Sequence, residues 1–236
     1  MAAINKLIGT IPCFENNKKM ELKLPPLGIL LELSSFFEPF LIYGKRVTAK
    51  AGSNLSWSSG TKPLVYLKSG LLSFYLNNKD EDINLFLGPK TLFNEMDYFI
   101  PSINNCCHIC MTDVEYFEFD INFLNLDIIK NNNEIFNRII QGICIKYLSL
   151  EEVVRILNIG NFSKRFANFL LSLYTYYEVE IFNYPLNQNN IAKLLRISKP
   201  SMIRLIHKFK AHGILNECSY GKIHLANINL LRSYAL

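Results

Sequence analysis

The sequence has no long, uninterrupted apolar run. Its longest apolar stretch, residues 27–43, is interrupted by Glu32, Glu38 and Pro39, whereas a membrane-spanning helix needs about 20 predominantly apolar residues. The N-terminus also lacks the basic, apolar and small-residue pattern of a secretory signal. We therefore expect a cytoplasmic protein that has no membrane partner.

The sequence also lacks the residue patterns that catalysis requires. It shows no matched nucleophile, base and orienting residue, no glycine-rich loop for a phosphate and no quartet of metal ligands. We therefore expect no enzyme activity, no catalytic residue, no bound metal and no cofactor. The sequence identifies no effector.

The six cysteines do not have the spacing of a disulfide-stabilised secreted scaffold. Three of them, Cys106, Cys107 and Cys110, surround His108, and thiolate and imidazole groups bind soft metals. However, side chains on a strand alternate between its two faces, so these groups need not converge. We favour reduced, buried, structural cysteines, with a redox or metal sensor as the alternative.

Acidic residues are scarce in the last third of the chain. Residues 159–236 contain three Asp or Glu and 10 Lys or Arg, a net charge of +7. Residues 1–158 contain 17 Asp or Glu and 15 Lys or Arg, a net charge of −2. Such an asymmetry is typical of a protein that binds a polyanion with one of its domains.

The first half of the chain shows two successive patterns. Apolar residues recur at helical spacing in residues 27–37, which predicts a short helix before Pro39. In residues 40–120, short runs of apolar, β-branched and aromatic residues alternate with turn signals, among them residues 68–70 and 88–89. Strands at this even spacing predict an antiparallel sandwich or barrel.

A helical pattern follows and runs for roughly six turns. From Ile135 to Leu157 its apolar residues are spaced 4, 4, 4, 3, 4 and 3 apart, and such a spacing is typical of a coiled-coil seam. We therefore predict a homodimer that pairs through this helix, although packing against its own domain would give the same pattern. The predicted dimer contacts are Ile139, Ile143, Tyr147, Leu150, Val154 and Leu157.

Residues 185–225 carry the strongest functional pattern. Asn187 is a suitable N-cap for a short helix at residues 188–195, and Ser198 is one for a second helix with basic side chains. A hairpin at residues 214–225 follows and suits a wing over the phosphate backbone. Two short helices joined by a tight turn fit the major groove of DNA.

The stretch from Leu186 to Arg204 resembles the helix-turn-helix of the Crp/Fnr superfamily. The family pattern has a polar cap, Leu/Ile-Ala, a Leu-Gly turn and Ser-Arg-Glu-Thr-Val before a final Arg. Upstream, the glycine-containing segments at residues 43–47, 65–70 and 86–95 are similar to the turns of the family's β-roll. The resemblance covers about residues 36–230.

The resemblance implies an α+β fold in three parts. These are an N-terminal sensor domain with an antiparallel β-roll (residues 1–128), a long dimerisation helix (129–160) and a C-terminal winged helix-turn-helix domain (161–236). The implied function is that of a homodimeric, sequence-specific transcription regulator, whose partners are double-stranded DNA, RNA polymerase and a small-molecule effector. The alternative is a ligand- or redox-sensing module that acts through protein partners.

Two departures from the family pattern bear on how DNA is read. Leu195-Arg196 stands where the turn glycine is usual, so a non-glycine residue has to adopt an unusual backbone angle. Pro200 replaces the Glu that reads cytosine in several members, so we expect that preference to be absent. The residues predicted to contact DNA are Asn187, Gln188, Ser198, Lys199, Ser201, Arg204 and Lys208.

A third departure concerns the effector. Cyclic nucleotide binding in the family requires a glycine, a Glu for the ribose and an Arg for the phosphate. The chain has Asn94 and Glu95 at matching positions and no Arg in residues 47–137, so we expect no control by cyclic nucleotides. In the long helix, Leu150 and Glu151 stand where nucleotide-binding members of the family have hydroxyl side chains. The carboxylate of Glu151 would repel a nucleotide phosphate. The residues assigned to the effector pocket are Asn94, Glu95, Leu150 and Glu151.

Overall fold

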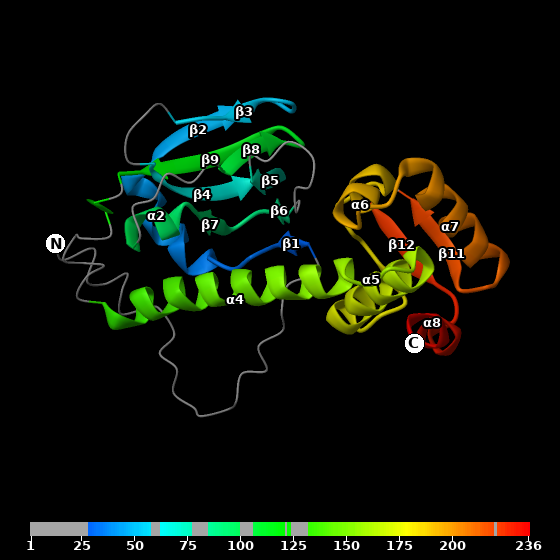
Figure 1. The fold of residues 1–236 in the computed structure, drawn as a ribbon. Helices are drawn as coiled ribbons and strands as arrows, with labels where there is room; N and C mark the ends of the chain where they lie inside the picture. Colours follow the sequence, from blue (N-terminus) through cyan, green and yellow to red (C-terminus); the bar gives the residue numbers. More distant parts are fainter. Residues whose placement is uncertain are drawn as a thin grey trace.

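A computed structural model describes residues 28–57, 62–76, 85–99, 106–120, 122–123, 132–219 and 221–236. A β-rich domain comes first, a long helix, α4 (Asn133–Leu157), lies along it, and a smaller C-terminal domain follows (Figure 1). The α+β architecture expected from the sequence is confirmed. Within the described residues, no helix is both long enough and apolar enough to cross a membrane.

Two sheets build the β-rich domain. One has the order β1-β6-β5-β8-β3, with bounds Ile29–Leu30, Leu85–Leu87, Leu72–Leu76, Cys106–Cys110 and Asn54–Leu55. The other has the order β2-β9-β4-β7, with bounds Lys45–Ala49, Val114–Phe119, Leu64–Ser69 and Thr91–Phe93. Neighbouring strands are antiparallel, as predicted, except that β1 and β6 are parallel. One hydrophobic cluster joins the sheets, with Leu72 from the first and Val65 from the second.

A 3₁₀ helix, η1 (Ser35–Tyr43), replaces the helix that the sequence predicted before Pro39. Pro39 lies inside η1, and residues 29–30 form strand β1 instead. The prediction was wrong because Ile29 pairs with Phe86, far along the chain, and a local periodicity carries no information on such a pairing.

Gly70, between β4 and β5, is a position where only glycine fits. Its φ is +92°, and an added Cβ would lie 2.4 Å from the carbonyl oxygen of Asp113. We expect Gly70→Ala to lower the free energy of unfolding by about 1–3 kcal/mol more than Gly52→Ala does, measured by urea denaturation. Gly52 also has a positive φ, +85°, but open space around its Cβ position. Equal losses in the two variants would show that the close approach to Asp113 is unimportant.

Helix α4 joins the two domains. The carboxamide oxygen of Asn132 caps it by accepting bonds from the N–H groups of the first turn. Ile135 and Ile139 of its first half pack against the aromatic core that η1 shares with the β-roll. Val153 and Ile156 of its second half pack into the core of the C-terminal domain.

The C-terminal domain is a winged helix-turn-helix. Its helices are α5 (Phe162–Tyr177), α6 (Gln188–Leu194), α7 (Lys199–Ala211) and α8 (Ile228–Ala235). Strands β10 (Ile181–Phe182), β12 (Lys222–Leu225) and β11 (Leu215–Ser219) form one antiparallel sheet in that order, and the β11–β12 hairpin is the predicted wing. The sequence did not indicate α8, which packs along α5 and whose end accepts a bond from Asn168 (3.1 Å).

Candidate nucleic-acid interface and effector cavity

The turn between α6 and α7 is tight and carries one strained residue. Arg196 has a φ of 51°, in the left-handed region that favours glycine, so the missing turn glycine has the consequence that we predicted. The buried Arg165 donates to the carbonyl of Leu195 (2.8 Å) and to that of Ile159 (2.9 Å). One side chain thereby fixes the turn relative to the segment that links α4 to α5.

Helix α7 presents a basic face to solvent. Ser198 caps it, Pro200 lies in its first turn, and its sequence contains no Asp or Glu. The helix lies on the side of its domain that faces away from the β-roll (Figure 1). Its buried residues are Met202, Leu205, Ile206 and Phe209. Its exposed residues include Lys199, Pro200, Ile203, Arg204, His207, Lys208 and Lys210.

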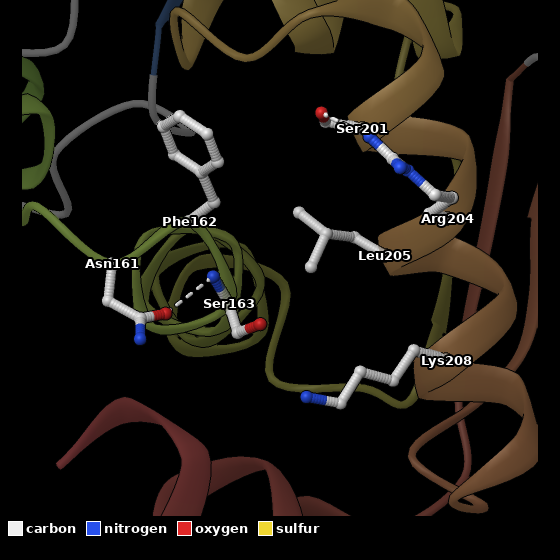
Figure 2. Close-up of a pocket in the computed structure, with 7 residues that line it drawn as sticks. All are labelled: Asn161, Phe162, Ser163, Ser201, Arg204, Leu205 and Lys208. Atoms are coloured by element: carbon white, nitrogen blue, oxygen red, sulfur yellow. Dashed lines mark hydrogen bonds between the residues drawn. The ribbon is translucent and has the colours of Figure 1, made fainter.

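A short hydrogen-bond chain orients Arg204. Its Nη2 donates to Oγ of Ser201 (3.1 Å), which in turn bonds to Oγ of Ser198 (2.9 Å). The guanidinium therefore points back toward the start of α7, as Figure 2 shows. This is the part of a recognition helix that reaches base edges.

Lys208 lies at the edge of this face, beside a groove of about 370 Å³ between α7 and the start of α5 (Figure 2). Its Nζ is 5.4 Å from the ring centroid of Tyr234 in α8. Across the groove lies the N-terminus of α5, where Asn161 caps the N–H groups of Ser163 and Lys164. A helix N-terminus next to a lysine favours phosphate, so this edge suits the DNA backbone.

The structure gives Asn187 and Gln188 roles within the fold. The carboxamide oxygen of Asn187 caps α6 by accepting the N–H of Asn190 (2.9 Å). The carboxamide nitrogen of Gln188 donates to the carbonyl of Cys218 in β11, which ties α6 to the wing. Contact of either residue with DNA stays a prediction.

On the outer face of α7, the sequence did not indicate Ile203 as a candidate DNA contact, and it indicated His207 only for packing or phosphate contact. Ile203, 39 % exposed, and His207 lie one turn apart, on the side opposite the buried stripe. An exposed apolar side chain beside Arg204 suits contact with a thymine methyl group. The signal was present in the sequence, because Ile203 does not fit the spacing of the apolar residues that face the core.

The structure corrects the predicted dimer seam on α4. Ile139 is 2 % exposed and packs against its own β-roll, so it cannot contact a second copy. Three more of the predicted residues are half-buried and also pack against their own chain: Ile143, Leu150 and Leu157. The two that face solvent are Tyr147 and Val154, which are 67 % and 37 % exposed.

A different stripe of α4 is exposed, and we call it the outer stripe. Its members are Ile140, Cys144, Tyr147, Glu151 and Val154. They alternate at spacings of four and three residues, as the a and d positions of a coiled coil do. The outer stripe shares two residues with the predicted seam, and this overlap hid it in the sequence.

A cavity of about 720 Å³ lies between the β-roll and α4. Three residues assigned to the effector pocket, Asn94, Glu95 and Leu150, line it. The fourth, Glu151, does not line the cavity within one copy of the chain and is exposed on the outer stripe. Glu95 is 3 % exposed, and its carboxylate accepts a bond from the ammonium group of Lys146.

Cys107 and Cys110 of β8 do not converge, as the alternation of side chains predicted, and the side chain of Cys106 lies outside the described part of the chain. His108 and Cys110 are buried on one face of the strand, whereas Cys107 is half-buried on the other. Burial raises the pKa of the Cys110 thiol and, in β11, raises the pKa of Cys218 to about 11. Neither is the exposed thiolate that a redox sensor needs. In the part of the chain that the structure describes, no three His, Cys, Asp or Glu side chains could hold a metal.

His108 should make the fold sensitive to acid. Burial, with smaller contributions from Lys62 and Lys146, lowers the pKa of its imidazole from 6.5 to about 4. On acidification, the imidazole is protonated in the unfolded chain, near pH 6.5, before it is protonated in the folded chain, near pH 4. The free energy of unfolding therefore falls as the pH drops from about 6.5 to about 4. We expect a loss of about 2 kcal/mol between pH 7 and 5 in urea denaturation. His108→Phe should remove this loss and His224→Phe should retain it, and equal losses would contradict a buried, neutral His108.

Comparisons with known proteins agree with this geometry. A family model described as a Crp-like helix-turn-helix domain matches residues 164–234. CprK complexed with OCPA is similar in structure, with a TM-score of 0.74 and 15 % identity over 90 % of this chain and 99 % of that one. A CooA mutant from Carboxydothermus hydrogenoformans has a TM-score of 0.69 and 18 % identity over 84 % of this chain and 90 % of that one. No curated protein matches the sequence.

A third similar structure, assigned to the Crp/Fnr family of transcriptional regulators, comes from Eubacterium rectale. It has a TM-score of 0.56 and 17 % identity over 83 % of this chain and 92 % of that one. Identities this low describe a shared fold, and the family model adds a match of the C-terminal domain to a Crp-like helix-turn-helix. The chain has the fold of the Crp/Fnr transcription regulators, and its residues 164–234 match a Crp-like helix-turn-helix domain.

Proposed function

We propose that the chain is a homodimeric, sequence-specific DNA-binding regulator of transcription. The observation that carries the proposal is the outer face of α7, which exposes Arg204 and lysines and contains no carboxylate. A guanidinium near the start of a recognition helix can pair bidentately with guanine. Lys208, at the edge of the same face, suits the neighbouring phosphates.

The proposed dimer places two α7 helices on one operator. Helix-turn-helix dimers bind half-sites about 34–36 Å apart, so each copy supplies one helix. The outer stripe of α4 offers apolar side chains that a single copy leaves uncovered, above all Tyr147. We propose that two copies pair through this stripe.

The proposed effector of the cavity is not a cyclic nucleotide. A nucleotide phosphate requires a cation, and residues 47–137 contain no Arg. Lys146 and Glu95 bind each other, so their charges already compensate. CprK, which has a similar fold, is complexed with OCPA, and this supports the proposal that the cavity binds a ligand. Micromolar affinity for cyclic AMP or cyclic GMP in calorimetry would contradict the proposal.

The proposed effector acts on the arrangement of the DNA-binding domain. Leu85 lines the cavity, and it also belongs to the hydrophobic cluster that contains Ile29 of β1 and Leu194 of α6. A ligand against Leu85 therefore touches a wall that packs on the helix-turn-helix. We propose that binding favours one orientation of the two α7 helices.

A gel-shift with genomic fragments and non-specific competitor DNA tests the function. We expect two copies per duplex on a small set of fragments, and weaker binding as salt rises. Combined replacement of Lys199, Arg204 and Lys208 by alanine should abolish the complex, whereas Lys45→Ala, on the exposed strand β2, should not. Equal binding to every fragment, or to none, would contradict the proposal.

A further inference from the structure

The cavity between the β-roll and α4 has apolar walls and no net charge. Its walls include Phe74, Leu85, Leu87, Phe93 and Ile143. The charged residues that line it are two cations, Lys62 and Lys146, and two anions, Glu95 and Asp97. Its volume is that of a typical site for a small molecule.

One residue that lines this cavity has a buried polar atom without a partner among the described residues. His108 lines the cavity and is 2 % exposed, and no described residue forms a hydrogen bond with its Nδ1. Its ring packs against those of Phe93 and Phe74, with centroid distances of 4.8 and 5.3 Å. An unsatisfied polar atom in apolar surroundings destabilises the fold, so a ligand that supplied the missing bond would gain affinity.

We infer that the cavity binds an uncharged, largely apolar molecule whose hydroxyl group forms a hydrogen bond with Nδ1 of His108. The inference rests on the proposed function, in which this cavity is the effector site. Neutral imidazole has one donor and one acceptor nitrogen, and a hydroxyl group matches Nδ1 in either tautomer because it can both donate and accept.

A carboxylate or phosphate fits this site poorly. Either group would need an uncompensated cation once it left water. The ammonium group of Lys146 is held by Glu95 and also donates to the carbonyl of Leu92 (2.6 Å). The remaining walls offer apolar contacts, which favour the hydrocarbon part of the ligand.

The test is a titration of the full-length chain with three rigid probes of similar shape. These are 1-adamantanol, 1-methyladamantane and 1-adamantanecarboxylate. Emission from Trp57, the only tryptophan, reports binding because its ring centroid lies 5.8 Å from that of His108. We expect 1-adamantanol to bind about fivefold more tightly than 1-methyladamantane and more than about tenfold more tightly than the carboxylate.

Two variants assign the preference to one atom. His108→Phe keeps an aromatic ring but no nitrogen, so it should bind 1-adamantanol and 1-methyladamantane equally. His224→Phe, in the wing, should keep the wild-type ranking. If His108→Phe does not fold, the ranking of the three probes by the wild-type chain decides the matter.

Three results would overturn the inference: tightest binding of the carboxylate, equal binding of the alcohol and the hydrocarbon, or no response to any probe. A gel-shift on the same preparation separates this failure from that of the proposed function. If DNA is bound but the probes are not ranked as expected, the inference fails alone. If the probes are ranked as expected but no operator is bound, the proposed function fails.

Discussion

Joint replacement of Tyr147 and Val154 by glutamate is expected to yield monomers that bind the operator about 10²–10⁴-fold more weakly than the wild-type chain. The two residues are 67 % and 37 % exposed on the outer stripe of α4, so the changes should not disturb the fold of one copy. In a parallel pair of helices, however, they would bring like charges together in the seam. Loss of the second α7 then removes the gain in affinity that linked binding sites provide. Light scattering and gel-shift titration measure the two effects.

The matched control adds the same two charges at exposed apolar positions away from α4. Ile42 in η1 is 74 % exposed and Val179, after α5, is 50 % exposed. Glutamate at both sites should leave dimerisation and DNA binding unchanged. A Tyr147/Val154 variant that remained dimeric would show that the outer stripe is not the seam.

Ile139→Glu distinguishes the corrected seam from the one that the sequence predicted. Because Ile139 is buried against its own β-roll, a glutamate there should lower the free energy of unfolding rather than separate two stable copies. A stable, folded monomer from this single change would restore the original seam.

Local signals in the sequence located two helices of the C-terminal domain, α6 and α7, well. Side-chain caps act within a few residues, so Asn187 and Ser198 marked the starts of α6 and α7 without any knowledge of the fold. The strain at Arg196 was also predictable, because a turn that normally needs glycine held none. These features depend on neighbours in the chain.

Features that depend on distant partners escaped the sequence. The apolar stripe of α4 was recognised, but its spacing could not show that Ile139 faces the β-roll while Tyr147 faces solvent. His108 was read as part of a cysteine-rich cluster, although its neighbours in space are Trp57, Phe74 and Phe93. Three of the four residues assigned to the effector pocket line one cavity, but the sequence did not indicate that His108 lines it as well.

Arg204→Ala and Lys208→Ala are expected to weaken DNA binding in different ways. Arg204 is held near the start of α7 by Ser201, so its loss should cost about 1–3 kcal/mol at one base pair and relax the preference there. Lys208 lies at the edge, beside the N-terminus of α5. Its loss should weaken binding to all sequences alike and lower the salt slope by about one unit. Selection from random duplexes, followed by salt titration, measures both.

The wild-type chain and Lys45→Ala, in the β-roll, serve as references for this selection. Both should return the same consensus, without the cytosine preference that a Glu supplies in several family members, because Pro200 has no polar side chain. Next to the base pair that Arg204 reads, we expect thymine, because Ile203 offers an exposed apolar surface to its methyl group. If Arg204→Ala kept the wild-type consensus while Lys208→Ala changed it, α7 would have to lie in the groove with Lys208, and not Arg204, facing the bases. The hydrogen bonds that orient Arg204 toward the start of the helix would then serve the fold and not the reading of bases.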